Sequence, residues 1–316
     1  MKTFLKRLAA FLAVPAAVAA AWLAFAIGCD FASYRAALKA PDGASVAVCG
    51  DSQTKDALDP ALFPGLFNFS NAASSHDQNL LRLRDLLDAN PGRFQTVLID
   101  ASPLKLGFDP TTPISEMASA RVHLTIHLYH PFAGKRPLGR FCALVRDVLF
   151  ARKFHEFRKA ALKGRWWRSS LAGGFAPDST KGFTNPRYRK RALEDVADKA
   201  ARIGALPPAT GGEALFAALA EEAAAVRERG AVPVFTVMPL SPALLKAADD
   251  ARLEAFSRAV SAFAQRENAP LLDFMRHPTE ESWWHDANHL NRTGAAAFTP
   301  VFVEKFAAIA AQPRTR

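Results

Sequence analysis

Four short apolar runs, separated by longer helical patterns, constrain the fold of this chain most strongly. The runs are rich in β-branched residues, as buried strands are, and occupy residues 45–50, 94–100, 232–238 and 270–275. The helical patterns span residues 78–89, 212–229, 242–267 and 293–311. Strands that alternate with helices predict a parallel sheet covered on both faces, so we expect an α/β domain. The 316 residues, 50% of them hydrophobic, suffice for one such domain with an insertion.

An uncharged apolar segment precedes this domain. Three basic residues occur within the first seven positions, and residues 8–27 then carry no charge over roughly the 20 residues that a bilayer-spanning helix needs. This pattern predicts a signal-anchor over residues 1–30, with residues 31–316 on the periplasmic or extracytoplasmic side of a bacterial inner membrane. The alternative is a lipoprotein signal, because FAIGC resembles a lipidation box that ends at Cys29. The apolar run is long for a cleavable signal, which favours the anchor.

The positive charge of the chain is concentrated in one segment. The formal net charge is +10, and residues 135–202 hold 18 Lys and Arg against six Asp and Glu. The strand and helix pattern is interrupted over residues 130–208, which we interpret as a basic, aromatic-rich insertion. Its motif RWWR, formed by Arg165, Trp166, Trp167 and Arg168, suits a membrane interface or an anionic glycan. A solvated basic face is the alternative, and nucleic acid is not an expected partner outside the cytoplasm.

The first apolar run ends in Cys49 and Gly50 and passes directly to Asp51 and Ser52. Functional groups of open parallel sheets collect outside the carboxyl ends of the strands, where this serine would lie. A glycine there lets the backbone approach a substrate closely. A serine hydroxyl is a weak nucleophile at neutral pH and needs a base within hydrogen-bond reach. Without such a base, Asp51 and Ser52 would only cap a helix.

A second polar motif, HDANHLN, follows the last apolar run at residues 285–291. Its position after a strand predicts that it lies at the same edge of the sheet as Ser52. Asp286 and His289 are three positions apart, which would place the carboxylate and the imidazole on one side of a helical turn. We expect His289 to act as the base and Asp286 to orient it.

Together, CGDSQT at residues 49–54 and DANHLN at residues 286–291 resemble the first and last sequence blocks of the SGNH (GDSL-like) hydrolase superfamily. The resemblance covers roughly residues 45–110 and 212–311. It implies a flavodoxin-like α/β/α sandwich in which Ser52 is the nucleophile, His289 the base and Asp286 the orienting acid. It implies no metal and no organic cofactor.

The middle blocks of the superfamily depart from their standard form in this chain. Members of the superfamily usually have a glycine in a second block and a GxND asparagine in a third, and both donate hydrogen bonds to the oxyanion. The corresponding stretches here are FNFSNAASS at residues 67–75 and LIDASPLK at residues 98–105, with neither feature in standard form. The best substitutes are the backbone N–H groups of Ser52 and Ser70 and the side chain of Asn71. An Asx-turn is the alternative role for Asn71. One missing oxyanion donor costs about a hundredfold in rate or more, so an active enzyme must replace it.

With its altered middle blocks and its predicted amino-terminal anchor, the chain resembles the DltD and AlgX/AlgJ proteins. Those proteins handle acyl groups on exported polymers beside membrane-bound O-acyltransferases. The resemblance implies a serine esterase or O-acyltransferase that acts on a cell-envelope or exported polysaccharide. The alternative is a non-catalytic scaffold that binds an anionic polymer or a membrane-bound O-acyltransferase. The expected partners are therefore an acyl ester or polysaccharide, the membrane, and a partner acyltransferase.

The remaining histidines and cysteines have simpler interpretations. His123, His127 and His130 have helical spacing that could suit zinc, but no carboxylate accompanies them closely, so a helix flank is favoured. His285 is expected in the loop near the pocket, and Asp77, beside His76, at a helix start. The three cysteines, Cys29, Cys49 and Cys142, do not describe a disulfide framework, and Cys49 is expected to be a buried apolar residue.

Overall fold

The computed structural model describes scattered positions among the first 32 residues and then residues 34–72, 74, 76–106, 175, 177, 183–205 and 213–310. The chain divides into two compact units, residues 1–37 with 120–172 and residues 38–119 with 173–316. Nearly all of the described residues belong to the second unit, to which the following description applies.

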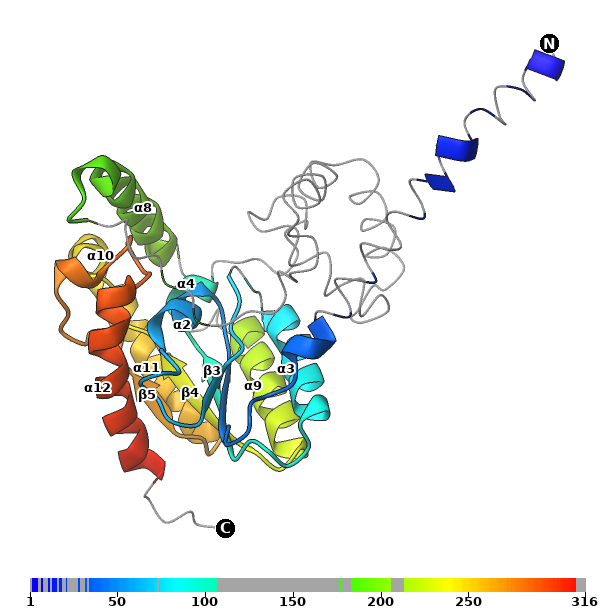
Figure 1. Cartoon of the computed structure of the whole chain (residues 1–316). Helices are drawn as coiled ribbons and strands as arrows, with labels where there is room; N and C mark the ends of the chain where they lie inside the picture. The colour runs from blue at the N-terminus through cyan, green and yellow to red at the C-terminus, as the bar shows by residue number, and fades with distance from the viewer. Residues whose placement is uncertain are drawn as a thin grey trace. The chain divides into compact units, whose positions relative to one another are not determined.

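Five parallel strands form the centre of this unit (Figure 1). They are β1 (Val46–Cys49), β2 (Leu66–Asn68), β3 (Thr96–Asp100), β4 (Val232–Val237) and β5 (Leu271–Asp273). Their spatial order is β2-β1-β3-β4-β5, and every adjacent pair is parallel. This is the strand order of flavodoxin-like doubly wound sheets, so the predicted α/β class with a parallel sheet is confirmed.

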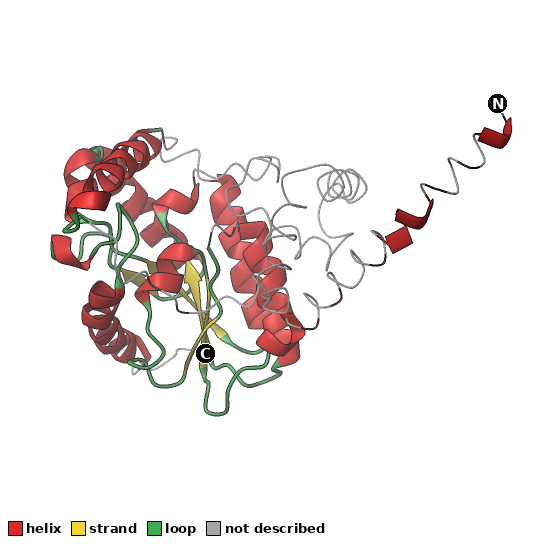
Figure 2. Cartoon of the chain, turned by 45° about the horizontal axis from the view of Figure 1, so that its top comes forward, coloured by secondary structure: helices red, strands yellow, loops and turns green. Residues whose placement is uncertain are grey.

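Helices cover both faces of the sheet (Figure 2). They are α2 (Ser52–Ala57), α3 (His76–Ala89), α4 (Pro103–Leu106), α8 (Pro186–Gly204), α9 (Glu213–Glu228), α10 (Pro242–Ala247), α11 (Asp250–Arg266) and α12 (Arg292–Ala310). A 3-10 turn, η2 (Glu281–Trp283), precedes α12.

Aromatic side chains pack the two helical layers against the sheet. On one side, Phe302 of α12 stacks on Phe274, just after β5, with ring centroids 5.2 Å apart. On the other side, Phe263 of α11 lies 4.9 Å from Phe216 of α9 and 5.1 Å from Phe235 of β4. These rings are buried or nearly so, and their removal from water is the main stabilising contribution to such a core.

The structure differs from the sequence prediction in three elements. The helix predicted over residues 242–267 is two helices, because Asp249 ends the first pattern and caps α11 by accepting from the N–H of Arg252 at 3.2 Å. Strand β2 was missed, since it has only three residues and ends in the polar Asn68. Residues 186–204, assigned to the insertion, form the amphipathic helix α8, which packs on α10.

The amino-terminal segment and most of the insertion lie outside the described residues. Within the part of the chain that the structure describes, no helix is both long enough and apolar enough to cross a bilayer. Many residues of the segment 8–27 are not among those described, and Trp166, Trp167, Arg165 and Arg168 also lie outside them. The membrane anchor and the role of the RWWR motif therefore stay predictions.

Candidate active site

The turn between β1 and α2 presents Ser52 at the carboxyl end of β1. Asp51 is the N-cap of α2, and its Oδ1 accepts from the N–H of Gln53 at 2.7 Å. Gly50 is packed tightly here, because a Cβ at this position would lie 2.1 Å from Oγ1 of Thr54 and 3.1 Å from Cβ of Asp100. Asp51 thus caps the helix as the alternative interpretation proposed, while the hydroxyl of Ser52 is left for another partner.

A buried polar network fixes α2 below that turn. The side-chain amide of Asn68, at the end of β2, donates to the carbonyls of Thr54, Lys55 and Leu58, the last at 2.9 Å. Its Oδ1 accepts from the N–H of Ser70 at 3.1 Å. Asn68 therefore satisfies carbonyls at the carboxyl end of a six-residue helix that is too short to be stable alone.

The HDANHLN motif forms a loop, so the predicted helical turn is wrong. The carboxylate of Asp286 and the imidazole of His289 nevertheless lie side by side. Oδ1 of Asp286 accepts from the N–H groups of Asn288 and His289, at 3.1 and 3.0 Å. This Asx-type turn folds the chain back by side-chain to main-chain hydrogen bonds. Both carboxylate oxygens of Asp286 then lie 2.8 Å from Nδ1 of His289.

The structure brings the three predicted residues into one hydrogen-bonded series. Nε2 of His289 lies 2.7 Å from Oγ of Ser52, across 237 positions of sequence. Because Asp286 occupies the Nδ1 side, Nδ1 carries the hydrogen and Nε2 is left to accept from the serine hydroxyl. All three residues are partly exposed.

The pKa values of the two charged partners move apart. Burial opposes ionisation of Asp286, but the adjacent His289 and the hydrogen bonds outweigh burial and lower the pKa of Asp286 to about 2. Burial likewise opposes the charged form of His289, but the attraction of Asp286 outweighs it and raises the pKa of the imidazole above its ordinary value. Asp286 is therefore ionised at neutral pH, where it stabilises a protonated His289.

Two residues beside the series were not singled out from the sequence. Gln53 is buried and bridges two elements, since its Nε2 donates to the carbonyl of Asn288 at 3.3 Å and its Oε1 accepts from the hydroxyl of Ser102. Asp56 pairs with Lys55 at 2.6 Å, yet burial outweighs this pairing and raises its pKa. The adjacency of Gln53 to Ser52 is the one sequence signal that pointed to either residue.

The predicted oxyanion donors differ in the hydrogen bonds that they make. The N–H of Ser70 donates to Oδ1 of Asn68, and its hydroxyl accepts from the N–H of Gly50 at 3.1 Å, so both groups have structural partners, and the role of Ser70 as an oxyanion donor stays a prediction. Asn71 is buried at the same turn, and its N–H donates to the carbonyl of Gly50 at 3.0 Å. The backbone N–H of Ser52, in the first turn of α2, stays a candidate.

The other predicted positions lie outside the hydrogen-bonded series. His285 is in the same loop, with its Nε2 3.9 Å from the carboxylate of Asp286 and its N–H donating to the carbonyl of His289 at 2.8 Å. His76 begins α3 and pairs with Glu222 of α9 at 2.8 Å. Cys49 is buried in β1, as predicted. His123, His127, His130, Cys29 and Cys142 lie outside the described residues.

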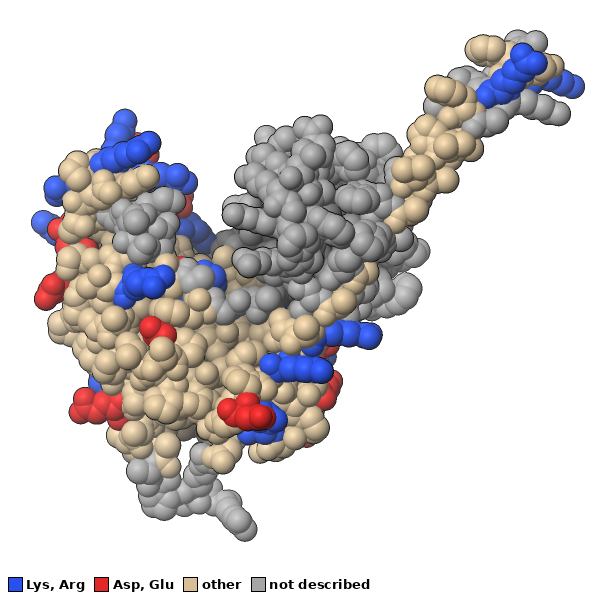
Figure 3. Space-filling view, in the orientation of Figure 1, with Lys and Arg blue, Asp and Glu red and all other residues tan. Residues whose placement is uncertain are grey.

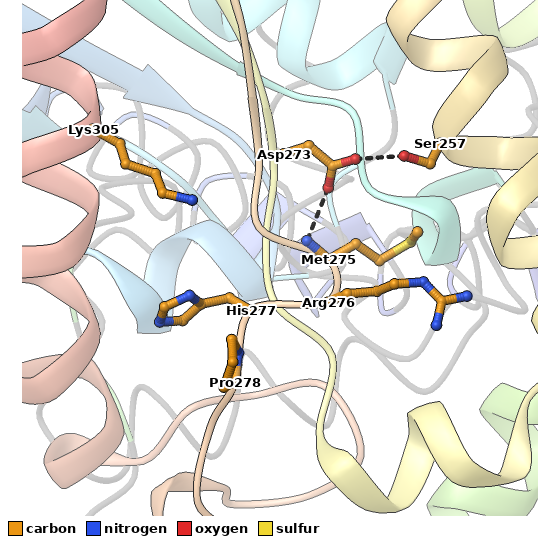
Figure 4. A pocket seen from close by; sticks show the side chains of 7 residues that line it. All are labelled: Ser257, Asp273, Met275, Arg276, His277, Pro278 and Lys305. Carbon is orange, nitrogen blue, oxygen red and sulfur yellow. Dashed lines mark hydrogen bonds between the residues drawn. The ribbon is translucent and has the colours of Figure 1, made fainter.

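A separate cavity opens beside β5 (Figure 4). Asp273 forms part of its wall, where it accepts from Ser257 at 2.6 Å and from the N–H of Met275 at 2.9 Å. The rest of the wall is formed by Arg276, His277, Pro278 and Lys305. Neither Ser52 nor His289 lines this cavity, which is therefore separate from the candidate active site.

No protein-family model and no curated protein match the sequence. Among solved structures, a proposed acylhydrolase from Bacteroides fragilis is 12% identical at a TM-score of 0.43, with 88% of this chain and 94% of that chain covered. A GDSL-like lipase from Bacteroides thetaiotaomicron is 13% identical at a TM-score of 0.41, with 89% and 96% covered.

Proposed function

We propose that the chain is a membrane-tethered, extracytoplasmic serine esterase or O-acyltransferase that acts on a cell-envelope or exported polysaccharide. The observation that carries the catalytic part is the hydrogen-bonded series of Ser52, His289 and Asp286 at the carboxyl ends of the strands. The tether and the polysaccharide rest on the sequence pattern and on the resemblance to the SGNH superfamily.

In this proposal, Oγ of Ser52 attacks the carbonyl carbon of an ester while its proton passes to Nε2 of His289. Asp286, held ionised, stabilises the imidazolium that forms. As the tetrahedral intermediate collapses, the C–O bond to the alcohol breaks and His289 returns the proton to the leaving oxygen. Water or a sugar hydroxyl then attacks the acyl-serine by the same steps in reverse, which gives hydrolysis or transfer.

The oxyanion of the intermediate needs hydrogen-bond donors in addition to the triad. The backbone N–H of Ser52 is the first candidate, and the Asn71 side chain stays the second. A single well-placed donor is worth on the order of a hundredfold in rate. We therefore expect Asn71→Ala to lower kcat on a small acetyl ester by about a hundredfold if Asn71 is that donor, with little change in KM.

One observation favours a second candidate function. Ser70, a predicted oxyanion donor, has structural partners for both its N–H and its hydroxyl. A non-catalytic envelope scaffold that binds an anionic polymer or a membrane-bound O-acyltransferase would need no oxyanion hole. It would also need no base beside Ser52, and the 2.7 Å contact with His289 therefore favours the enzyme.

Reaction with a fluorophosphonate probe separates the two functions. The full chain in detergent is treated with the probe, and the adduct is located by mass spectrometry. An activated serine gives an adduct on Ser52 that is lost in Ser52→Ala and strongly reduced in His289→Ala. Ser282→Ala, which changes an exposed serine of η2, is the matched control and should label as the unmodified chain does. Absence of any adduct on folded protein would contradict catalysis.

A further inference from the structure

The first two turns of α8 carry four exposed cations, Arg187, Arg189, Lys190 and Arg191. Basic side chains gather over this outer end of the helix (Figure 3). Leu193, which follows them, is 49% exposed. We call the four cations together with Leu193 the α8 surface.

The four cations have no acidic partner within the described part of the chain. The first turn of α8 contains no acidic residue, and Arg187 lies over the ring of its neighbour Tyr188 at 5.8 Å. Further along the same helix, by contrast, Lys199 lies 3.7 Å from Asp195. Among the described residues, no carboxylate neutralises the cations of the α8 surface, which leaves their charge available to an external anion.

Their position on the helix is electrostatically unfavourable. Aligned peptide dipoles place partial positive charge at the amino end of a helix, where carboxylates stabilise and cations destabilise. Like charges three or four positions apart, such as Arg187 with Lys190 and Arg191, also repel each other. An anionic partner that covers this end of the helix would remove both electrostatic penalties. Binding of an anion therefore explains the arrangement of the cations, whereas the stability of the helix does not.

The helix that bears these cations is firmly held. Ala192, Val196 and Ile203 are buried along the helix, and Asn185 caps its start by accepting from the N–H of Arg187 at 3.1 Å. Asp195 accepts from the N–H of Ala287, in the loop of the candidate active site, at 3.3 Å. The α8 surface is therefore fixed relative to the site rather than carried on a loose arm.

We propose that the α8 surface docks on anionic lipid headgroups. Lipid suits it better than a polymer strand, because the cations project from the outer end of a helix and share it with an exposed leucine, as in interfacial helices. Each Lys or Arg near an anionic bilayer contributes to attraction within a Debye length. The predicted amino-terminal anchor would keep a bilayer at high local concentration, so even weak docking would be populated.

Hydrogen exchange of the full chain in lipid nanodiscs tests the proposal. We expect amides of residues 187–193 to exchange at least about tenfold more slowly in discs that contain phosphatidylglycerol than in discs of phosphatidylcholine alone. The protection should disappear in 0.5 M NaCl (about a 4 Å screening length). It should also disappear when Arg187, Arg189, Lys190 and Arg191 are all changed to Gln.

A matched control removes four exposed cations elsewhere, through Arg84→Gln, Lys246→Gln, Arg258→Gln and Arg266→Gln. This variant has the same net charge as the first and should keep the protection. The first variant should also be no less heat-stable than the unmodified chain, because it relieves repulsion at the helix start. A large loss of stability would contradict this part of the argument.

Two results would overturn the proposal. Equal exchange in both kinds of disc would show a solvated basic face. Protection by a soluble polyuronate in neutral discs, without protection by anionic lipid, would assign the surface to a polymer. Neither result depends on the chemistry of Ser52, because labelling by the fluorophosphonate probe is measured separately.

Discussion

Asp56 and Ser52 are four positions apart and share one face of α2, so a second carboxylate lies beside the candidate triad. Burial disfavours protonation of His289, and Asp286 is the main opposing influence, but Asp56 and Asp51 also raise the pKa of His289. The charge of Asp56 therefore helps to decide the pH at which His289 becomes an acceptor.

Asp56→Asn should lower the pKa of His289, because it removes one of the negative charges that stabilise the imidazolium. His289 must be neutral to act as a base, so the acidic limb of the profile of kcat/KM against pH should move to lower pH. Measurement of ester hydrolysis between pH 4 and 9 tests this. Asp42→Asn, which changes an exposed carboxylate that pairs with Arg93 before the amino end of β1, should leave the limb in place.

Gly50→Ala should destabilise the protein by about 1–3 kcal/mol, because the new methyl group would meet Thr54 and Asp100 in a packed turn. Urea denaturation monitored by tryptophan fluorescence gives the change in unfolding free energy. Gly204→Ala is the control, since no atom lies within 4 Å of a Cβ at that position. Equal stability of the two variants would show that the turn relaxes freely.

At the scale of elements, α2 depends on β2 through the side chain of Asn68. Asn68→Ala would leave the N–H of Ser70 and several helix carbonyls without their buried partner, at a cost of about 1–3 kcal/mol. Asn68→Asp keeps the acceptor for Ser70 but loses the donor. If the helix carbonyls matter most, both variants should lose similar stability and both should label more slowly with the fluorophosphonate probe.

Elements with a strong hydrophobic period were predictable, and those fixed by polar side chains were not. The β1, β3, β4 and β5 runs are mostly apolar, and each was placed within two residues at both ends. Strand β2 ends in Asn68, whose side chain makes hydrogen bonds to α2. The local sequence pattern does not predict these contacts. The boundary between α10 and α11 depends on Asp249, the N-cap of α11. The apolar pattern continues across this boundary, so the sequence predicted one helix.

Part of the candidate site was predictable from the sequence, because it follows the predicted strands. Ser52, Asp286 and His289 belong to short motifs at strand ends, where the topology of a parallel sheet brings distant residues together. The structure brings them into contact, although their catalytic roles stay a prediction. The hydrogen bonds of Ser70 with Asn68 and Gly50 depend on side-chain rotamers and could not be derived from the spacing of residues in the sequence.

At the scale of the whole molecule, the paired charges of the site predict how stability changes with pH. The pKa of Asp286 is about 2 in the folded protein against an ordinary 3.8, so its contribution is present above 3.8 and is lost as pH falls through about 2. The pKa of His289 is raised above 6.5, so its contribution is complete below 6.5 and is lost as pH rises through the folded value.

The stability difference between the unmodified chain and Asp286→Asn should therefore be largest between about pH 4 and 6.5. It should shrink on both sides of this window. Thermal unfolding at a series of pH values measures it, with Asp42→Asn as an exposed control. A difference that stays constant from pH 3 to 9 would show that Asp286 and His289 do not interact in solution.

The pairing of Ser52 with a histidine 237 positions later has a consequence for biosynthesis. The ribosome makes the imidazole 237 positions after the serine. While the intervening chain is being synthesised, the hydroxyl therefore lacks the nitrogen with which it is hydrogen-bonded in the folded protein. The contact can form only after both segments have emerged and the parallel sheet has brought its strand ends together.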